Sequence, residues 1–258
     1  MSRAGLQNPL RAMSAIGCAL WALGALAGTL RVGPTRIELS AKRPVVVLEV
    51  QNGSDTATLA QIDTFDWTQV GAGDVLTPAT DLIVTPLVLS LAAGETRFVR
   101  VGLRQANQTD VERSYRLFVR EIPPAFAAGT GLQFALRIGV PVFALPADGA
   151  RRAMAAARAS ELSWRWVPDI QRCVTVQVFN PAPRHERVLA AEMLSRSGEV
   201  LWRAADPAYV LAGSGRTLPP VLCPPSIAEA ASLRLEMESG TVNLPVEAQS
   251  MVVDAKPH

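Results

Sequence analysis

Residues 132–143, LQFALRIGVPVF, carry a large apolar side chain at every second position. These side chains belong to Leu132, Phe134, Leu136, Ile138, Val140 and Val142. An alternation with period two places all of them on one face of an extended β-strand. Pro141 lies in the same stretch and has no backbone N–H, which largely confines proline to strand ends, bulges and sheet edges. We therefore expect a long apolar strand at a sheet edge, a position that soluble proteins usually protect with charge or shortness.

The rest of the chain is a series of short strand patterns separated by turn residues such as Asn52-Gly53 and Pro123-Pro124. In the first half the patterns cover residues 45–50, 59–69, 81–85, 97–103 and 115–122. In the second half they cover residues 162–167, 173–179, 188–194, 200–202, 210–211, 233–237 and 243–248. No long amphipathic helix pattern interrupts them. The expected fold is all-β, with two consecutive β-sandwiches of about 100 residues each.

The N-terminus has the pattern of a secretory signal peptide, which we place at residues 1–27. Arg3 and Arg11 give a basic start, an uncharged and mostly apolar run follows, and Ala25-Leu26-Ala27 is a small-residue cleavage pattern. The alternative is an uncleaved membrane anchor, because residues 12–30 nearly reach the length that spans a bilayer. Either reading exports the remainder. That remainder divides into a domain at 28–146, a linker at 147–159 and a domain at 160–258.

Export makes the cysteines informative. Cys173 and Cys223 are the two that remain after cleavage, and in an oxidising compartment they could form a disulfide. Two buried thiols are the alternative, because the sequence does not show how closely their Cα atoms approach. No histidine accompanies them, so we expect no metal site.

Composition and motifs favour a binding protein over an enzyme. With 49% hydrophobic and 19% charged residues the chain is not of the disordered class, and a net charge of +2 gives no reason to expect nucleic acid. The two histidines, His185 and His258, lie in no recognised nucleophile pattern. Phosphate loops and dinucleotide fingerprints are also missing from the sequence, so we expect no cofactor.

Several short motifs of the first half carry a family resemblance. In chain order they are Thr35-Arg36-Ile37, Val50-Gln51-Asn52, Thr85-Pro86, the turn at 91–95, and Arg120-Glu121-Ile122-Pro123-Pro124 just before the alternating strand. Over residues 31–146 this order resembles the periplasmic pilus-assembly chaperones of the chaperone–usher pathway. Val140-Pro141-Val142-Phe143 is similar to the archaic (sigma) branch, which assembles pili of spore-coat-U-type subunits. The resemblance implies two immunoglobulin-like domains in the periplasm.

The resemblance also implies a use for the alternating strand. Chaperones of this family lend the equivalent strand to a pilin subunit that lacks its last strand, and then deliver the subunit to an outer-membrane usher. The donor residues would be Leu132, Phe134, Leu136, Ile138, Val140 and Val142, with the central four contributing most. The alternative is that these side chains form the domain's own core. Exposed apolar edges also make self-association of the free protein plausible.

Arg36 occupies the position where the family has a basic residue that holds the C-terminal carboxylate of the subunit. A bidentate arginine–carboxylate pair there would fix the register of the donated strand. The family's second anchor is a lysine late in the donated strand, where this sequence has Pro141. Arg116 is the replacement that we expect, with Arg137 as a weaker candidate. Glu112 aligns with an acidic residue of an interdomain ion pair, but the usual arginine partner is replaced by Leu145, so we do not expect that pair.

Two other functions fit the composition less well. A structural pilus subunit or adhesin should carry its own N-terminal donor segment, whereas here the alternating strand is internal and a second complete domain follows it. A secreted carbohydrate-binding or hydrolytic sandwich should show clustered aromatic residues or paired acids, and the sequence shows neither.

Overall fold

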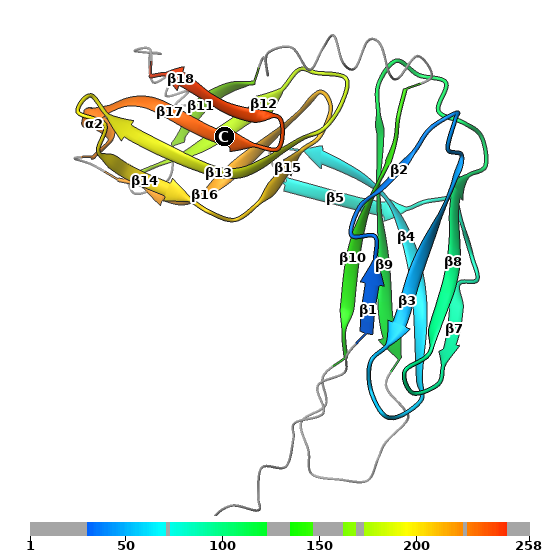
Figure 1. Cartoon of the computed structure of the whole chain (residues 1–258). Helices are drawn as coiled ribbons and strands as arrows, with labels where there is room; N and C mark the ends of the chain where they lie inside the picture. The colour runs from blue at the N-terminus through cyan, green and yellow to red at the C-terminus, as the bar shows by residue number, and fades with distance from the viewer. Residues whose placement is uncertain are drawn as a thin grey trace, which may run out of the picture.

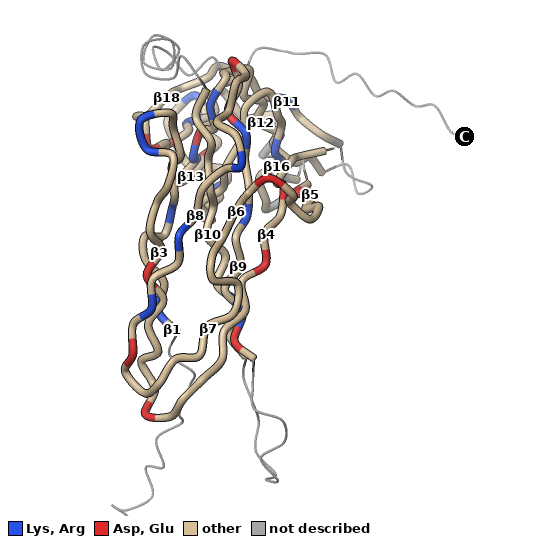
Figure 2. Tube along the Cα trace, turned by 90° about the vertical axis from the view of Figure 1, so that its right-hand side faces the viewer, with Lys and Arg blue, Asp and Glu red and all other residues tan. Residues whose placement is uncertain are grey.

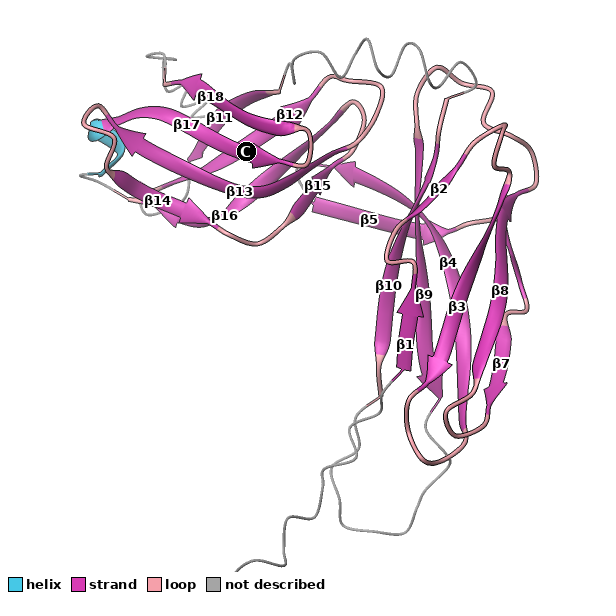
Figure 3. Cartoon of the chain, in the orientation of Figure 1, coloured by secondary structure: helices cyan, strands magenta, loops and turns pink. Residues whose placement is uncertain are grey.

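The computed structural model describes residues 30–70, 73–122, 135–146, 162–168, 173–223 and 226–246. The predicted signal peptide, the predicted linker, Leu132 and Phe134 lie outside these ranges. Figure 1 shows two elongated β domains that meet at a bend, and Figure 3 shows that strands make up nearly all of both. Two consecutive immunoglobulin-like sandwiches were expected, and the fold class is confirmed.

The first domain packs two sheets around one core. One sheet has the order β1-β3-β8-β6, which are Leu30–Gly33, Val45–Asn52, Thr96–Leu103 and Leu82–Thr85. The other has the order β2-β10-β9-β4-β5, with β7 also paired to β4. These strands are Ile37–Leu39, Arg137–Ala144, Arg113–Ile122, Thr58–Val70, Gly73–Pro78 and Val88–Leu91. Alternate side chains of β3, β8 and β9 face inward, and Leu48, Val99 and Leu117 are fully buried there.

The second domain repeats the arrangement with a separate core. One sheet has the order β11-β12-β16, which are Ser163–Pro168, Val174–Asn180 and Ser214–Leu222. The other has the order β14-β13-β17-β18, with β15 also paired to β13. These are Val200–Ala204, Glu186–Ser195, Ala230–Met237, Gly240–Pro245 and Ala208–Val210, and the one-turn helix α2, Ser226–Glu229, precedes β17. A disulfide joins Cys173 and Cys223, whose Cα atoms are 4.2 Å apart.

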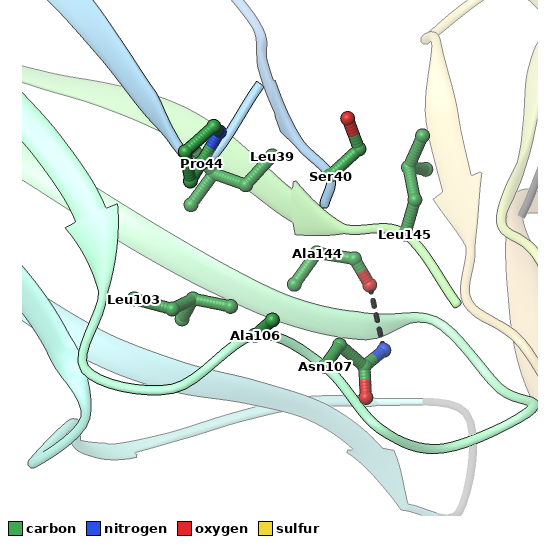
Figure 4. A pocket seen from close by; sticks show the side chains of 8 residues that line it. All are labelled: Leu39, Ser40, Pro44, Leu103, Ala106, Asn107, Ala144 and Leu145. Carbon is green, nitrogen blue, oxygen red and sulfur yellow. Dashed lines mark hydrogen bonds between the residues drawn. The ribbon is translucent and has the colours of Figure 1, made fainter. Parts of the chain in front are cut away.

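A buried asparagine fixes the last residue of β10. The Asn107 amide donates hydrogen bonds to the carbonyl oxygens of Val111 and Ala144, both at 2.9 Å, and its Oδ1 accepts from Thr109. Figure 4 shows Asn107 beside a small, mostly apolar cavity of about 40 Å³ between β2, β10 and the loop that follows β8. Because Asn107 satisfies the Ala144 carbonyl, β10 ends at a defined position, and Phe143 is held at the junction with the second domain.

A buried carboxylate crosses the junction. Glu112, with a fully buried side chain, accepts a hydrogen bond from the backbone N–H of His185 at 3.1 Å, and its Oε1 lies 2.6 Å from His185 Nδ1. Arg184 Nε is 3.5 Å from the other carboxylate oxygen. The family's usual arginine partner is replaced by Leu145, and Glu112 instead contacts Arg184 and His185, in the turn before β13.

The hairpin of β4 and β5 makes a second connection, visible in Figure 1 as two strands that reach the second domain beside β15. The Gln69 amide donates to the carbonyl oxygen of Tyr209 at 2.9 Å and accepts from the N–H of Leu211 at 3.0 Å. Asp74 accepts a hydrogen bond from Arg216 at 2.7 Å. Trp67 packs with Phe143, Tyr209 and Leu211 between these bonds. A bridging amide, an ion pair and a shared aromatic cluster together restrain the interdomain angle.

Candidate functional site

A cleft of about 470 Å³ with a polar lining lies at the junction of the two domains. The first domain contributes Pro34, Thr35, Arg36, Arg116, Gly139 and Pro141, and the second contributes Arg187, Tyr209 and Glu238. Among the charged residues of this lining are three arginines and one glutamate, so the cleft has an excess of positive charge. Figure 2 shows that basic and acidic residues are otherwise interspersed along both domains. The cleft is thus suited to an anion.

One wall of the cleft is a free edge of β10. Strand β2 pairs with β10 at residues 142–144, and the described residues include no partner on that side for 137–141. The carbonyl oxygen of Leu136 accepts from the N–H of Glu121 in β9, whereas the N–H of Leu145 donates to the carbonyl oxygen of Leu39 in β2. Because both backbone groups of a strand residue point the same way and alternate along the strand, odd-numbered residues face the free edge. Arg137 and Gly139 therefore present N–H and C=O groups there, and Pro141 presents its C=O.

This parity explains how β10 tolerates a proline. The missing N–H of Pro141 lies on the side that lacks a ladder partner, so no hydrogen bond with β9 is lost. The sequence prediction of a sheet edge is therefore correct for the backbone of residues 137–141. The neighbouring segment 142–144 is covered by β2.

The side chains of the alternating row differ from the prediction. Val140 and Val142 are 1% and 0% exposed and belong to the core of the first domain. Leu136 and Ile138 are partly buried against the same core, toward the open end of the sandwich. The prediction of an exposed apolar row is wrong for Val140 and Val142, because even-numbered side chains point between the two sheets. A donor role for Leu136 and Ile138 remains a prediction.

Arg116 is the residue that we expect to replace the family's second carboxylate anchor. It projects from β9 into the cleft, where its guanidinium lies 3.9 Å from the centre of the Trp67 ring. Among the described residues, no acidic side chain lies within 4.0 Å of it. Burial lowers the pKa of Arg116, partly offset by the carboxylate of Asp74. A partly desolvated arginine without an ion pair is well placed to receive an anionic group. Arg137, in contrast, lies over Phe118 and does not line the cleft.

Arg36 is the last residue of the short loop between β1 and β2, and it is already paired. Its Nη1 lies 2.5 Å from Oε2 of Glu238, and Arg187 Nη1 lies 2.9 Å from the other oxygen of the same carboxylate. The hydrogen bond to Glu238 raises the pKa of Arg36. Burial raises the pKa of Glu238, but the hydrogen bonds from both arginines outweigh burial and lower it. One carboxylate therefore bridges two arginines across the cleft.

Sequence reasoning did not find Arg187 and Glu238. Both belong to the second domain, where the resemblance extended to position and β character and offered no motif. A basic residue at the start of β13 and an acidic residue in the turn before β18 carry no local signal of proximity, because they are 51 residues apart.

The described residues contain no cluster of histidine, cysteine and acidic side chains that could hold a metal ion. In the same part of the chain, no helix has the length and apolar character needed to cross a membrane.

Comparisons with known proteins agree with this architecture. Residues 29–150 match the family model for pili and flagellar-assembly chaperones, PapD N-terminal domain. No curated protein sequence matches the chain.

Solved structures cover both domains. A chain of the CsuC–CsuE chaperone–tip adhesion subunit complex, from archaic chaperone–usher Csu pili of Acinetobacter baumannii, has a TM-score of 0.67 at 22% identity over 84% of this chain and 98% of that chain. The CupB2 chaperone of Pseudomonas aeruginosa has a TM-score of 0.57 at 25% identity over 84% and 100%. The SafB–SafA chaperone–pilin complex of Salmonella enterica gives 0.56 at 16% over 85% and 97%.

Proposed function

The chain belongs to the pilus-assembly chaperones of the chaperone–usher pathway, and from this premise we propose that it captures a pilin subunit in the cleft between its domains. The free edge of β10 pairs with the subunit, and Arg36 and Arg116 hold the subunit's C-terminal carboxylate. The protein acts in the periplasm, delivers the subunit to an outer-membrane usher and performs no catalysis. Among the matched structures, CsuC and SafB are recorded in complexes with a tip adhesion subunit and a pilin.

One observation carries this proposal: the free backbone edge of Arg137 to Pro141 runs along the same cleft that contains Arg36 and Arg116. A strand that added to this edge would gain ladder hydrogen bonds worth about 0.5–1.5 kcal/mol each. A carboxylate at the end of that strand would meet the two guanidinium groups. Backbone pairing and carboxylate binding therefore support the same register.

The experiment is co-purification from the periplasm with a co-expressed spore-coat-U-type pilin subunit. We expect Arg36→Ala and Arg116→Ala each to reduce recovery of the subunit at least fivefold. Arg31→Ala, on the exposed side of β1, is the matched control and should behave like wild type. Circular dichroism verifies that each variant is folded.

The backbone contribution is tested separately. Arg137→Pro removes an N–H from the free edge and leaves the β9 ladder intact, whereas Arg137→Ala removes the same side chain and keeps the N–H. We expect the proline variant to recover several-fold less subunit than the alanine variant. Equal recovery would show that this edge does not pair with the subunit, and wild-type recovery by Arg36→Ala would reject the carboxylate anchor.

A further inference from the structure

The carboxylate of Glu238 is held as a bound ligand would be. Its two oxygens accept hydrogen bonds from Arg36 and Arg187, at 2.5 Å and 2.9 Å, within the cleft that also contains Arg116. In addition, the backbone N–H of Glu238 donates to the carbonyl oxygen of Arg187 at 3.1 Å. A carboxylate shared between two guanidinium groups is the arrangement that a peptide C-terminus would adopt on the same arginines.

The pair of arginines has more donors than Glu238 can satisfy. Each guanidinium has five N–H donors, and a carboxylate accepts in about four directions. Arg187 Nε is buried and has no acceptor among the described residues. Apart from Glu238, the carboxylate nearest to Arg36 is that of Glu38, at 3.8 Å. These arginines therefore have N–H donors to spare, and an incoming carboxylate would break no hydrogen bond of theirs except those to Glu238.

The side chain of Glu238 can also rotate out of the cleft. It lies between β17 and β18, and its neighbours Ser239 and Gly240 are exposed. Its own side chain is 36% exposed, so rotation into water would restore its hydration at modest cost. When one carboxylate replaces another on Arg36 and Arg187, the charges of the site stay balanced and neither guanidinium is left unpaired.

We propose that Arg187 is a third arginine of the subunit-carboxylate site, and that Glu238 occupies this site in the free protein until an incoming carboxylate displaces it. The inference rests on the proposed function, because that function supplies the incoming carboxylate. It adds a ligand from the second domain to a site otherwise built from the first. Subunit binding then exchanges an interdomain ion pair for contacts with the subunit.

The test uses N-acetylglycinate as a terminal carboxylate, with N-acetylglycinamide as the uncharged comparison, titrated into the full mature chain. Binding is followed by the arginine Nε–Hε resonances in nitrogen-15 NMR spectra, with Arg36 assigned by loss of its signal in Arg36→Lys. A competitor that occupies the site nine-tenths of the time raises the apparent Kd about tenfold. We therefore expect Glu238→Gln and Glu238→Ala to bind N-acetylglycinate about tenfold more tightly than wild type. Glu236→Gln, on an exposed position of β17, is the matched control and should match wild type.

Arg187 is tested in the background that lacks the competitor. Arg187→Ala combined with Glu238→Gln should bind at least fivefold more weakly than Glu238→Gln alone. If both Glu238 variants bind N-acetylglycinate no more tightly than wild type, Glu238 does not compete for the site and the inference is wrong. The carboxylate site of the proposed function would still stand in that case. An unchanged affinity in the Arg187 double variant removes Arg187 from the site. If N-acetylglycinate shifts the Arg36 resonance neither in wild type nor in any variant that retains Arg36, the carboxylate site of the proposed function itself is rejected.

Discussion

Glu112 and His185 join the two domains through a contact that is buried on both sides. The carboxylate lies 2.6 Å from the ring Nδ1 of His185, and Phe143 stacks on the imidazole at 3.5 Å between ring centres. The N–H of Glu112 also donates to the carbonyl oxygen of Pro183 at 2.9 Å. Hydrogen bonds and stacking therefore fix the turn before β13 against β9 and β10, the strands that form one wall of the cleft.

We predict that Glu112→Ala lowers the free energy of unfolding by about 3 kcal/mol, because it leaves the N–H of His185 without its buried acceptor and removes the carboxylate that lies 3.5 Å from Arg184. Urea denaturation measures the change. Glu49→Ala, which removes an exposed carboxylate from β3, is the control and should stay within about 0.5 kcal/mol of wild type. A similarly small effect of Glu112→Ala would mean that the carboxylate does not stabilise the junction.

The hairpin contact between Asp74 and Arg216 predicts a dependence on pH. Burial raises the pKa of Asp74, but hydrogen bonds from Gln69, Arg216 and Trp67 outweigh burial and lower it below its ordinary value of 3.8. A lowered pKa in the folded state means that the unfolded state binds protons more readily, so the stabilisation is present above about pH 4 and is lost as the pH falls through the folded pKa.

Asp74→Asn should therefore have a lower melting temperature than wild type by a constant amount between pH 5 and 7, and the difference should shrink below about pH 4. Thermal melts of both proteins across this range test the prediction, with Asp55→Asn in an exposed turn as the control. A difference that persists unchanged at pH 3 would show that the Asp74 carboxylate is not the group responsible.

Much of the fold could be predicted from local patterns, because period-two alternation reports which face of a strand is buried. The predicted strand at 97–103 and the observed β8 differ by one residue, and the pattern at 45–50 is extended by two residues in β3. Strand β16 was missed because it begins at Ser214-Gly215, which has the composition of a turn, and contains Pro219 and Pro220. Strand β5 was missed because its side chains are exposed and show no apolar alternation.

The candidate site could be predicted only in part. Period-two alternation shows which side chains share one face of a strand, but not whether that face is covered by the protein's own second sheet or by a partner. It therefore could not distinguish donor side chains from core side chains at Val140 and Val142. Arg36 and Arg116 both line the cleft, and their role as carboxylate anchors stays a prediction. Arg187 and Glu238 depend on how the second domain is oriented, and no local pattern of the sequence contains that orientation.

The burial of the alternating row separates stability from subunit binding. Val140→Ala should destabilise the first domain by about 2 kcal/mol, because it removes two methyl groups from a fully packed site. Leu136→Ala should cost less stability, since Leu136 is only partly buried, but should reduce recovery of a co-expressed pilin subunit several-fold. Urea denaturation and co-purification measure the two effects. If Leu136→Ala retains the subunit fully, the donor role of that side chain is wrong.

The disulfide should stabilise the second domain alone. It joins the residue before β12 to the residue after β16 and closes a loop with a sequence separation of 50. A cross-link of this length restricts the unfolded chain, and its removal in Cys173→Ala/Cys223→Ala should cost about 3 kcal/mol. Hydrogen exchange measured by mass spectrometry can locate the loss, because the two domains have separate cores. We expect faster exchange in β12 and β16 and unchanged exchange in β3 and β8. Equal acceleration in both domains would show instead that the sandwiches unfold as one cooperative unit through the Glu112–His185 and Asp74–Arg216 contacts.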